Sequence, residues 1–154
     1  MGIDVFENLP KEFARTFVPA DLNVKSFADV EPLFNQLLER ELNSADDLEQ
    51  WLKDGSELGN VIDEHGSAIY IKSTVDTANE QFKKDFLEFI QHFDPKIKPI
   101  TEKLNRKFYD SPHRSGLDKD KYKLYERSVV TALELFRKEN IPLETEISEL
   151  TNKY

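Results

Sequence analysis

Cysteine is absent from this sequence of 154 residues. Its absence excludes disulfide bridges, thiolate metal ligands and cysteine nucleophiles together, and it fits a reducing compartment. Long apolar runs are missing as well, since the longest is far shorter than the roughly 20 residues of a membrane-spanning helix. The first residues lack a basic stretch followed by an apolar one, so no secretory signal is visible. We therefore expect a cytoplasmic protein with no membrane partner.

Positive charge is scarce, because 21 Lys and Arg face 30 Asp and Glu and leave a formal net charge of −9. This balance argues against nucleic acid as a partner, since binding to phosphates needs positive charge. Residues 95–123 depart from the balance, with nine basic side chains against four acidic ones. The basic ones are Lys96, Lys98, Lys103, Arg106, Lys107, Arg114, Lys119, Lys121 and Lys123. This segment either attracts an acidic partner or packs beside the acidic N-terminal third, and the second is the simpler interpretation.

Catalytic signatures are also missing. A zinc peptidase of the H-E-x-x-H type needs two histidines one helical turn apart, with a glutamate that activates a metal-bound water. None of the three histidines, His65, His92 and His113, is followed by glutamate. The G-x-S-x-G nucleophile elbow, the P-loop and the dinucleotide-binding glycines do not occur either. A Ser-His-Asp triad stays open, because its members need not be neighbours in sequence.

The remaining metal-ligand candidates are weak. Asp63, Glu64 and His65 are consecutive, and three neighbours on a helix or a strand point in different directions and do not converge on one ion. Glu88 and His92 share a helix face, but two ligands alone make a poor site. His113 follows a proline in a loop and is expected at the surface. We therefore assign no catalytic, cofactor-binding or metal-ligating residue in this chain.

Helical periodicity is what the sequence has in abundance. A first apolar stripe predicts a helix from Phe27 capped by Ser26, with Pro32 either kinking it or starting it. A second stripe predicts a long helix capped by Ser44. Its members are Leu48, Trp51, Leu52, Leu58, Val61, Ile62 and Ile69. Gly55, Gly59 and Gly66 lie near this stripe, and we expect them to mark a close helix crossing rather than a break.

The strongest stripe comes next along the chain. Its members are Phe82, Phe86, Phe89, Phe93, Ile97, Ile100, Leu104 and Phe108. Core packing is the usual role of such a stripe, and lining a ligand cavity is the alternative. Thr77 and Glu80 form a T-x-x-E capping-box pattern at its start. Because the apolar phase survives Pro95 and Pro99, we expect one kinked long helix or two coaxial helices that break near Asp94.

The segment between these two helices is ambiguous, because AIYIKSTV (68–75) is rich in β-branched residues. Since Ile62 and Ile69 keep helical phase into it, we interpret it as the end of a long helix stabilised by packing rather than propensity.

The C-terminal part predicts a loop at 109–118 and a helix capped by Asp118. Its expected buried face is Tyr122, Tyr125, Val129, Leu133 and Phe136, and the chain should stop or bend at Asn140 and Pro142. Leu143, Ile147 and Leu150 open a last helix that is still running at Tyr154, so the sequence looks like a fragment.

The fold class that results is all-α, with four to five helices, two of them long, packed antiparallel through short loops. Residues 1–25 are predicted to form an extended N-terminal arm anchored by Phe6, Phe13 and Phe17. Residues 26–154 are predicted to form a helical lobe.

Five segments carry a family resemblance: RTFVPADLNV (15–24), VEPLFNQLLERELNSADDLEQWLKDGSEL (30–58), STVDTANEQF (73–82), KLNRKFYDSP (103–112) and YERSVVTALELFRKENIPLETEISELTNKY (125–154). Their order and spacing resemble the N-terminal helical region of oligoendopeptidase F-like zinc metallopeptidases, relatives of thimet oligopeptidase. The resemblance covers nearly the whole chain and rests on extended similarity rather than on a catalytic signature.

The resemblance implies a role without implying catalytic residues. Complete members of the family are all-α, cytosolic enzymes several times longer, which cleave short peptides with one zinc ion bound by the H-E-x-x-H histidines and a later glutamate. That motif lies downstream of the matched region, so no zinc or catalytic residue is transferred to this chain. The region is expected to form one wall of a deep cleft that admits oligopeptides, with the catalytic domain of the same polypeptide as its partner.

Three hypotheses are compatible with these features. The first is a non-catalytic lobe of a zinc oligopeptidase, which predicts exposed apolar surface where the catalytic part docks. The second is a free-standing helical protein-interaction module, which predicts a closed polar surface. The third, an enzyme in its own right, lacks any motif.

Overall fold

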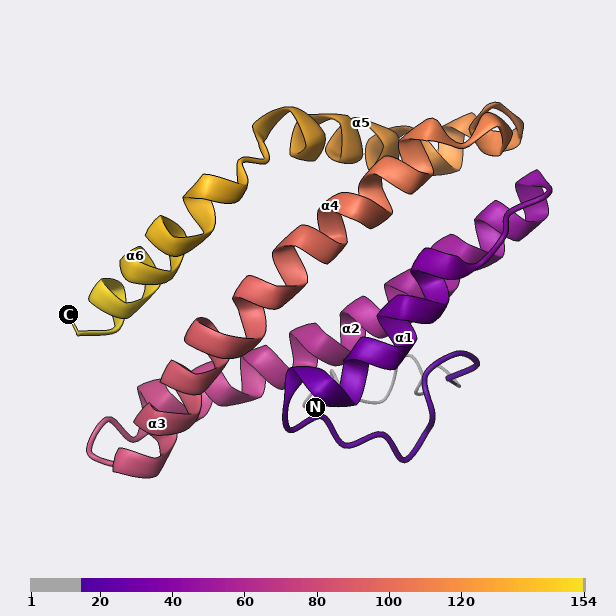
Figure 1. Cartoon of the computed structure of the whole chain (residues 1–154). Helices are drawn as coiled ribbons and strands as arrows, with labels where there is room; N and C mark the ends of the chain where they lie inside the picture. Colours follow the sequence, from indigo (N-terminus) through magenta and orange to yellow (C-terminus); the bar gives the residue numbers. More distant parts are fainter. Residues whose placement is uncertain (1–14, 154) are drawn as a thin grey trace, which may run out of the picture.

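The computed structural model describes residues 15–153, and every regular element among them is helical (Figure 1). The elements are α1 (Phe27–Glu39), α2 (Ala45–Val75), α3 (Glu80–Glu88), a π-helical turn (Phe89–Phe93), α4 (Asp94–Asp110), a 3-10 turn (Pro112–Gly116), α5 (Lys119–Leu135), a second 3-10 turn (Lys138–Asn140) and α6 (Ile141–Lys153). The predicted anchors Phe6 and Phe13 lie outside the described residues, whereas Phe17 packs against the core.

The all-α prediction is confirmed, with two long helices. α2 has 31 residues, and α3, the π-helical turn and α4 form an uninterrupted rod of equal length from Glu80 to Asp110. Counted with this rod as one, the described helices number five. AIYIKSTV belongs to α2, as expected, and the hydroxyl of Ser73 donates to the carbonyl oxygen of Tyr70 at 2.8 Å, near the end of that helix.

The rod shows why the apolar phase survives two prolines. Pro95 has no N–H, and its ring crowds the carbonyl four residues earlier, that of Gln91. The π-helical turn Phe89–Phe93 widens the backbone next to this point, and the N–H of Asp94 bonds to the carbonyl of Phe89. The irregularity therefore lies where the break was expected, but the helix stays continuous.

The helix starts were predicted with mixed success. Ser44 caps α2 by accepting from the N–H of Asp47 at 3.0 Å, and Asp118 caps α5. The capping box at Thr77 was wrong. Helix α3 begins at Glu80, because the side chain of Asn79 accepts from two backbone N–H groups and forms a strong cap by itself.

α1 begins at Phe27 and runs through Pro32, so the alternative in which Pro32 starts the helix was wrong. Ser26 is its N-cap residue, and the carboxylate of Asp29 accepts from the N–H of Ser26 at 2.8 Å. This contact is the returning half of a capping box.

The end of α5 was also misplaced. The helix ends at Leu135 rather than at Asn140, and Phe136 has extended backbone. Pro142 lies in the first turn of α6, where its missing N–H has no partner to lose. Of the face predicted to be buried, Val129 is 2% exposed, but Tyr125 is 39% exposed and packs edge-on against Phe108.

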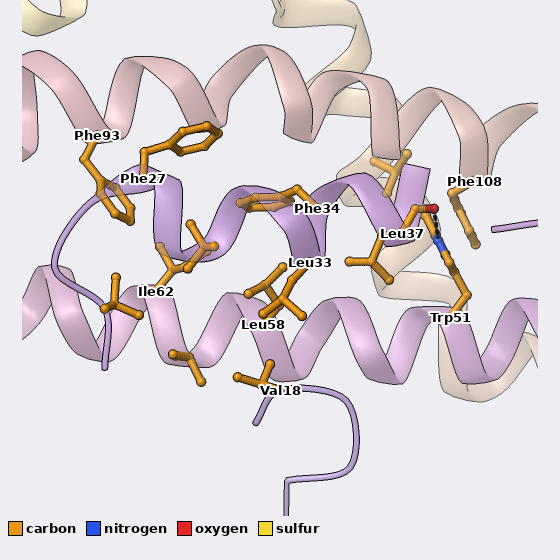
Figure 2. Close-up of a cluster of buried hydrophobic side chains, with 14 of the residues drawn as sticks. Val18, Phe27, Leu33, Phe34, Leu37, Trp51, Leu58, Ile62, Phe93 and Phe108 are labelled. Atoms are coloured by element: carbon orange, nitrogen blue, oxygen red, sulfur yellow. Dashed lines mark hydrogen bonds between the residues drawn. The ribbon is translucent and has the colours of Figure 1, made fainter. Parts of the chain in front are cut away.

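The core surrounds α1, which lies between α2 and α4 (Figures 1 and 2). Five residues of α1 are buried: Phe27, Val30, Leu33, Phe34 and Leu37. The core continues into α2 through Trp51 and Leu58 and into the rod through Phe93 and Phe108. In contrast, α5 buries only Val129 and no described side chain of α6 is fully buried. The hydrophobic core is therefore concentrated in the first two thirds of the chain.

The close helix crossing predicted from three glycines exists at one of them. A Cβ atom on Gly66 would lie 2.9 Å from Cζ of Phe89, on the π-helical turn. At Gly59 nothing lies within 4 Å of such an atom, and at Gly55 the nearest atom is at ordinary contact distance. The expectation was therefore wrong for Gly59, which has no crossing partner.

This difference predicts opposite effects of the same substitution. Gly59→Ala should stabilise the protein by up to about 1 kcal/mol, because alanine favours the helix and meets no neighbour. Gly66→Ala should destabilise it by about 1–2 kcal/mol, because the Phe89 ring is stacked on Phe93 and has little room to move. Urea unfolding of both variants measures the difference, and equal shifts of the same sign would contradict the packing at Gly66.

Candidate functional site

The histidine-containing motifs do not form a metal site. The side chains of Asp63 and Glu64 are exposed, whereas His65 is half-buried against the rings of Phe89 and Phe93, at 5.9 and 5.5 Å between centroids. Burial lowers the pKa of His65, and this effect outweighs the opposite effect of the negative charge of Asp29. Within residues 15–153, no group of three or more His, Asp or Glu side chains could hold a metal ion. The described residues therefore do not fit a zinc ion.

The other two histidines are isolated. The side chains of His92 and Glu88 approach to 4.0 Å, with 61% and 68% of them exposed, and no third ligand joins them in the described chain. His113 lies in the 3-10 turn after α4. Its loop position had suggested full exposure, but the side chain is partly buried. Neither histidine is held in a geometry for proton transfer or metal binding.

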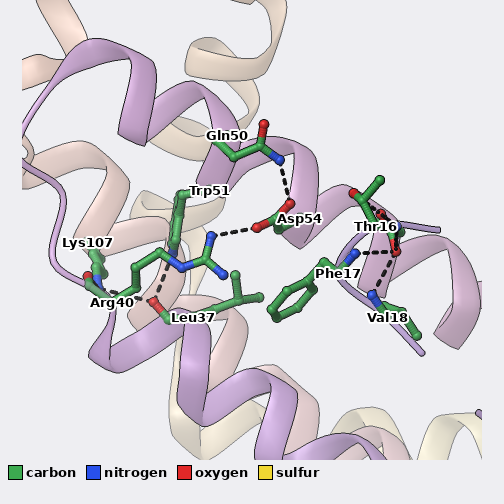
Figure 3. Close-up of polar contacts among 10 residues, drawn as sticks. Thr16, Phe17, Val18, Leu37, Arg40, Gln50, Trp51, Asp54 and Lys107 are labelled. Carbon is green, nitrogen blue, oxygen red and sulfur yellow. Dashed lines mark hydrogen bonds and ion pairs between the residues drawn. The ribbon is translucent and has the colours of Figure 1, made fainter.

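The most buried polar cluster joins the end of α1 to α2 and α4 (Figure 3). Asp54, 6% exposed, accepts from the guanidinium of Arg40 at 2.5 Å and from the amide of Gln50 at 2.7 Å. The indole N–H of Trp51 donates to the carbonyl of Leu37 at 2.8 Å. All of these groups find partners within the protein, so the cluster fastens helices and offers no reactive group.

Lys107 completes this cluster from α4. Its ammonium group donates to the carbonyls of Leu37 at 3.1 Å, Leu38 at 2.7 Å and Arg40 at 2.5 Å. These are carbonyls at the C-terminal end of α1, which lack helical partners and attract positive charge. Burial lowers the pKa of Lys107, and the charge of Arg40 adds to the shift.

Two residues of the basic segment 95–123 contact the N-terminal part of the chain. Besides Lys107, Lys121 contacts Glu49 of α2 at 2.5 Å, and Tyr122 donates to the same carboxylate. These two hydrogen bonds lower the pKa of Glu49 to about 2. The interpretation that this segment packs beside the acidic N-terminal part is supported by both contacts.

Glu57 holds the segment that precedes α1. Its carboxylate accepts from the backbone N–H groups of Thr16, Phe17 and Val18, at 3.0, 3.0 and 2.7 Å (Figure 3). Burial opposes ionisation here, but the backbone hydrogen bonds outweigh it and lower the pKa of Glu57. Three consecutive N–H groups around one carboxylate fix the arm to α2 and place Val18 in the core.

A cavity of about 540 Å³ is a candidate binding site. It lies between residues 23–28, the middle of α2 and the π-helical part of the rod. Apolar side chains line it together with three lysines, two histidines and two carboxylates. The charged and titratable members are Lys25, His65, Lys72, Asp85, Glu88, His92 and Lys96. No sequence motif indicated this site, because its walls come from three segments far apart in the chain.

An exposed apolar face is the other notable surface. On α6, Leu143, Ile147 and Leu150 are 56%, 61% and 46% exposed. The opposite side of α6 holds the rod through polar contacts, Glu144 to Lys98 at 2.6 Å and Glu149 to Gln91 at 2.7 Å. The three apolar side chains share one largely exposed face of α6, and Ile147 also borders a hollow lined by Tyr70 of α2 and Phe86 of α3. None of the described helices is both long and apolar enough to cross a membrane.

Comparison with known proteins gave one match. The family described as Peptidase M3 N-terminal domain matches residues 17–136, which is most of the chain. The match ends directly after α5, so α6 and its apolar face lie beyond it. Neither the curated proteins nor the solved structures contain a match.

The contacts of Lys107 predict a large effect of its removal. Lys107→Met keeps the length of the side chain but removes the donor of the Leu38 and Arg40 carbonyls, while Leu37 keeps its bond from Trp51. The substitution should lower the free energy of unfolding by about 2 kcal/mol. Lys103→Met, exposed one turn earlier on α4, is the matched control and should change it by less than about 0.5 kcal/mol. Chemical denaturation compares the two, and equal effects would contradict the anchoring role.

The contacts of Glu57 predict a dependence on pH. Because its folded pKa lies below the ordinary value of 4.5, its stabilising effect is present above pH 4.5 and is lost as the pH falls through the folded pKa. Glu57→Gln should therefore be less stable than the parent by about 1 kcal/mol at pH 7, and the gap should close towards pH 3. Thermal unfolding across this range checks it, and a gap that is independent of pH would contradict the charge-based anchor.

Proposed function

Because the chain belongs to the family of peptidase M3 N-terminal domains, we propose that it is the non-catalytic helical lobe of a zinc metallo-oligoendopeptidase. In this role it forms one wall of the cleft that receives short peptides in the cytoplasm. The lobe contributes shape and binding surface, whereas the zinc ion and its ligands belong to a catalytic domain. The described residues hold no set of metal ligands of their own.

The apolar face of α6 is the observation that carries the proposal. Leu143, Ile147 and Leu150 succeed one another at helical spacing and are all about half exposed or more. Such a row favours an interface over free solvent. Leu135, at the end of α5, is 71% exposed as well. A second layer of protein over α5 and α6 would give this half of the molecule the core that it lacks.

A catalytic domain of the same family is the occupant that these observations favour. The matched region ends before α6, which supports a position of this helix next to the catalytic part in a complete peptidase. A helix that is polar towards α4 and apolar on the other side is suited to join the two. A free-standing interaction module, the alternative function, predicts a closed polar surface and does not call for such a row.

Reconstitution tests the proposal. The purified chain is mixed with a separately produced catalytic domain of an M3 peptidase that carries H-E-x-x-H, and cleavage of a quenched fluorescent oligopeptide is measured with zinc present. We expect no turnover by the chain alone and turnover by the mixture well above that of the catalytic domain alone. Zinc-dependent cleavage by the chain alone would sink the proposal, and so would a mixture no more active than the catalytic domain.

Variants of α6 locate the interface in the same assay. Leu143→Asp with Ile147→Asp should abolish the gain on mixing, because both side chains would carry charge into an apolar contact. Since both positions are exposed in the chain alone, its own unfolding should change by less than about 0.5 kcal/mol each. Ser56→Asp, exposed on α2 and outside the proposed docking surface, is the control and should leave the gain unchanged. A full gain with the double variant would contradict docking on α6.

A further inference from the structure

The cavity beside the π-helical turn has two chemically distinct parts. Its inner wall is apolar and includes Val24, Phe27, Ile69, Phe89 and Phe93. Phe27 and Phe93 meet edge to face at 6.2 Å between centroids, so this wall is held by the core (Figure 2). Its volume of about 540 Å³ falls in the range of small-ligand sites, roughly 300–1,000 Å³.

Three lysines stand around this wall. Lys25 precedes α1, Lys72 lies on α2 and Lys96 lies on α4, so each comes from a different segment. The ammonium of Lys96 lies 5.5 Å from the centre of the Phe27 ring, which brings charge and apolar wall into contact. Within the described chain no carboxylate lies within 4.0 Å of these three ammonium groups.

The two carboxylates that line the cavity contact side chains of their own rod rather than the three lysines. Asp85 accepts from the amide of Gln81 at 2.6 Å, and Glu88 faces His92 at 4.0 Å. Asp29, close behind the cavity, accepts from the N–H groups of Lys25 and Ser26. The first turn of α1 also lines the cavity, and the positive end of its helix dipole adds to the lysines. With three lysines and two carboxylates, the lining has a formal charge of +1 in a chain of net charge −9.

We propose that this cavity binds the carboxyl-terminal residue of a short peptide, with its side chain on the apolar wall and its carboxylate among Lys25, Lys72 and Lys96. The proposal rests on the proposed function, since oligopeptides are the ligands expected there. An apolar wall beside cations favours a ligand that is apolar and anionic at once, and the last residue of a peptide with a large side chain is such a group. A bare anion would leave the wall unused.

Binding to the chain by itself tests the proposal. The probes are N-acetyl-leucyl-phenylalanine as the free acid, the same compound as its carboxyl amide, N-acetyl-glycyl-glycine as the free acid, and inorganic phosphate. Backbone amide shifts in ¹⁵N-labelled protein report both affinity and place. We expect the leucyl-phenylalanine acid to shift amides in 23–28, 65–72 and 85–96. Its amide should bind about tenfold more weakly, because one charge that contacts several lysines is lost.

Matched lysine variants test the charge. Lys72→Gln with Lys96→Gln should weaken the acid by about tenfold and leave the amide nearly unchanged. Lys119→Gln with Lys123→Gln removes the same charge from α5, outside the cavity, and should weaken the acid by less than about twofold. Both pairs are exposed, so their folding is expected to be intact.

The proposal would be overturned if the leucyl-phenylalanine acid and its amide bound with equal affinity, or if the acid shifted amides outside the cavity or none at about 10 mM. It would also be overturned if both lysine pairs weakened binding of the acid equally. Phosphate or glycyl-glycine acid as strong as leucyl-phenylalanine acid would overturn the assignment to an apolar carboxyl-terminal residue. Because this assay needs no catalytic domain, its failure with a successful reconstitution removes only the cavity assignment. A failed reconstitution removes the proposed function itself.

Discussion

The fastening of α1 between two long helices is the constraint on which the rest of the structure depends. A helix of 13 residues is too short to be stable alone, so its form depends on its contacts at each face and each end. Its apolar face is buried against α2 and α4, and its C-terminal carbonyls are bound by Trp51 and Lys107. Trp51 belongs to α2 and Lys107 to α4, so the C-terminal end of α1 ties these two helices together. The cavity lies at the N-terminal end of α1, between the same two helices.

The same arrangement explains why the molecule is uneven. The core is complete around α1, where three helices enclose one another, and it thins out towards α5 and α6. Net stability is a small remainder of large opposing terms. The part of the molecule formed by α5 and α6, which has little core of its own, therefore depends for its stability on contacts with the other helices or with a partner. α6 combines an exposed apolar row with polar contacts to the rod. This pattern is typical of a helix whose apolar face packs against a partner.

Periodicity alone was enough for most of the fold, because apolar stripes report which face of a helix is buried. It located α1, α2 and the rod. The capping preferences of serine and aspartate added Ser44 and Asp118 as N-caps. It failed where the deciding partner is distant in sequence or where two signals compete. Asn79 displaced Thr77 because both are good caps and only backbone geometry selects one. The candidate site was invisible for the first reason, since Lys25, Lys72 and Lys96 lie on separate segments that tertiary packing alone brings to one cavity.

The π-helical turn Phe89–Phe93 connects the two surfaces to which function is assigned. On one side Phe89, His92 and Phe93 line the cavity, and on another Gln91 holds α6 through Glu149. Wide turns of this kind are uncommon and are frequent at functional sites, and here the nearby Pro95 explains how the sequence produces one. A partner seated on α6 would therefore bear on the π-helical turn, three of whose residues line the cavity. In the proposed function, docking on α6 and peptide binding in the cavity share this short piece of backbone. A lobe that supplies no catalytic group could influence the reaction in this way.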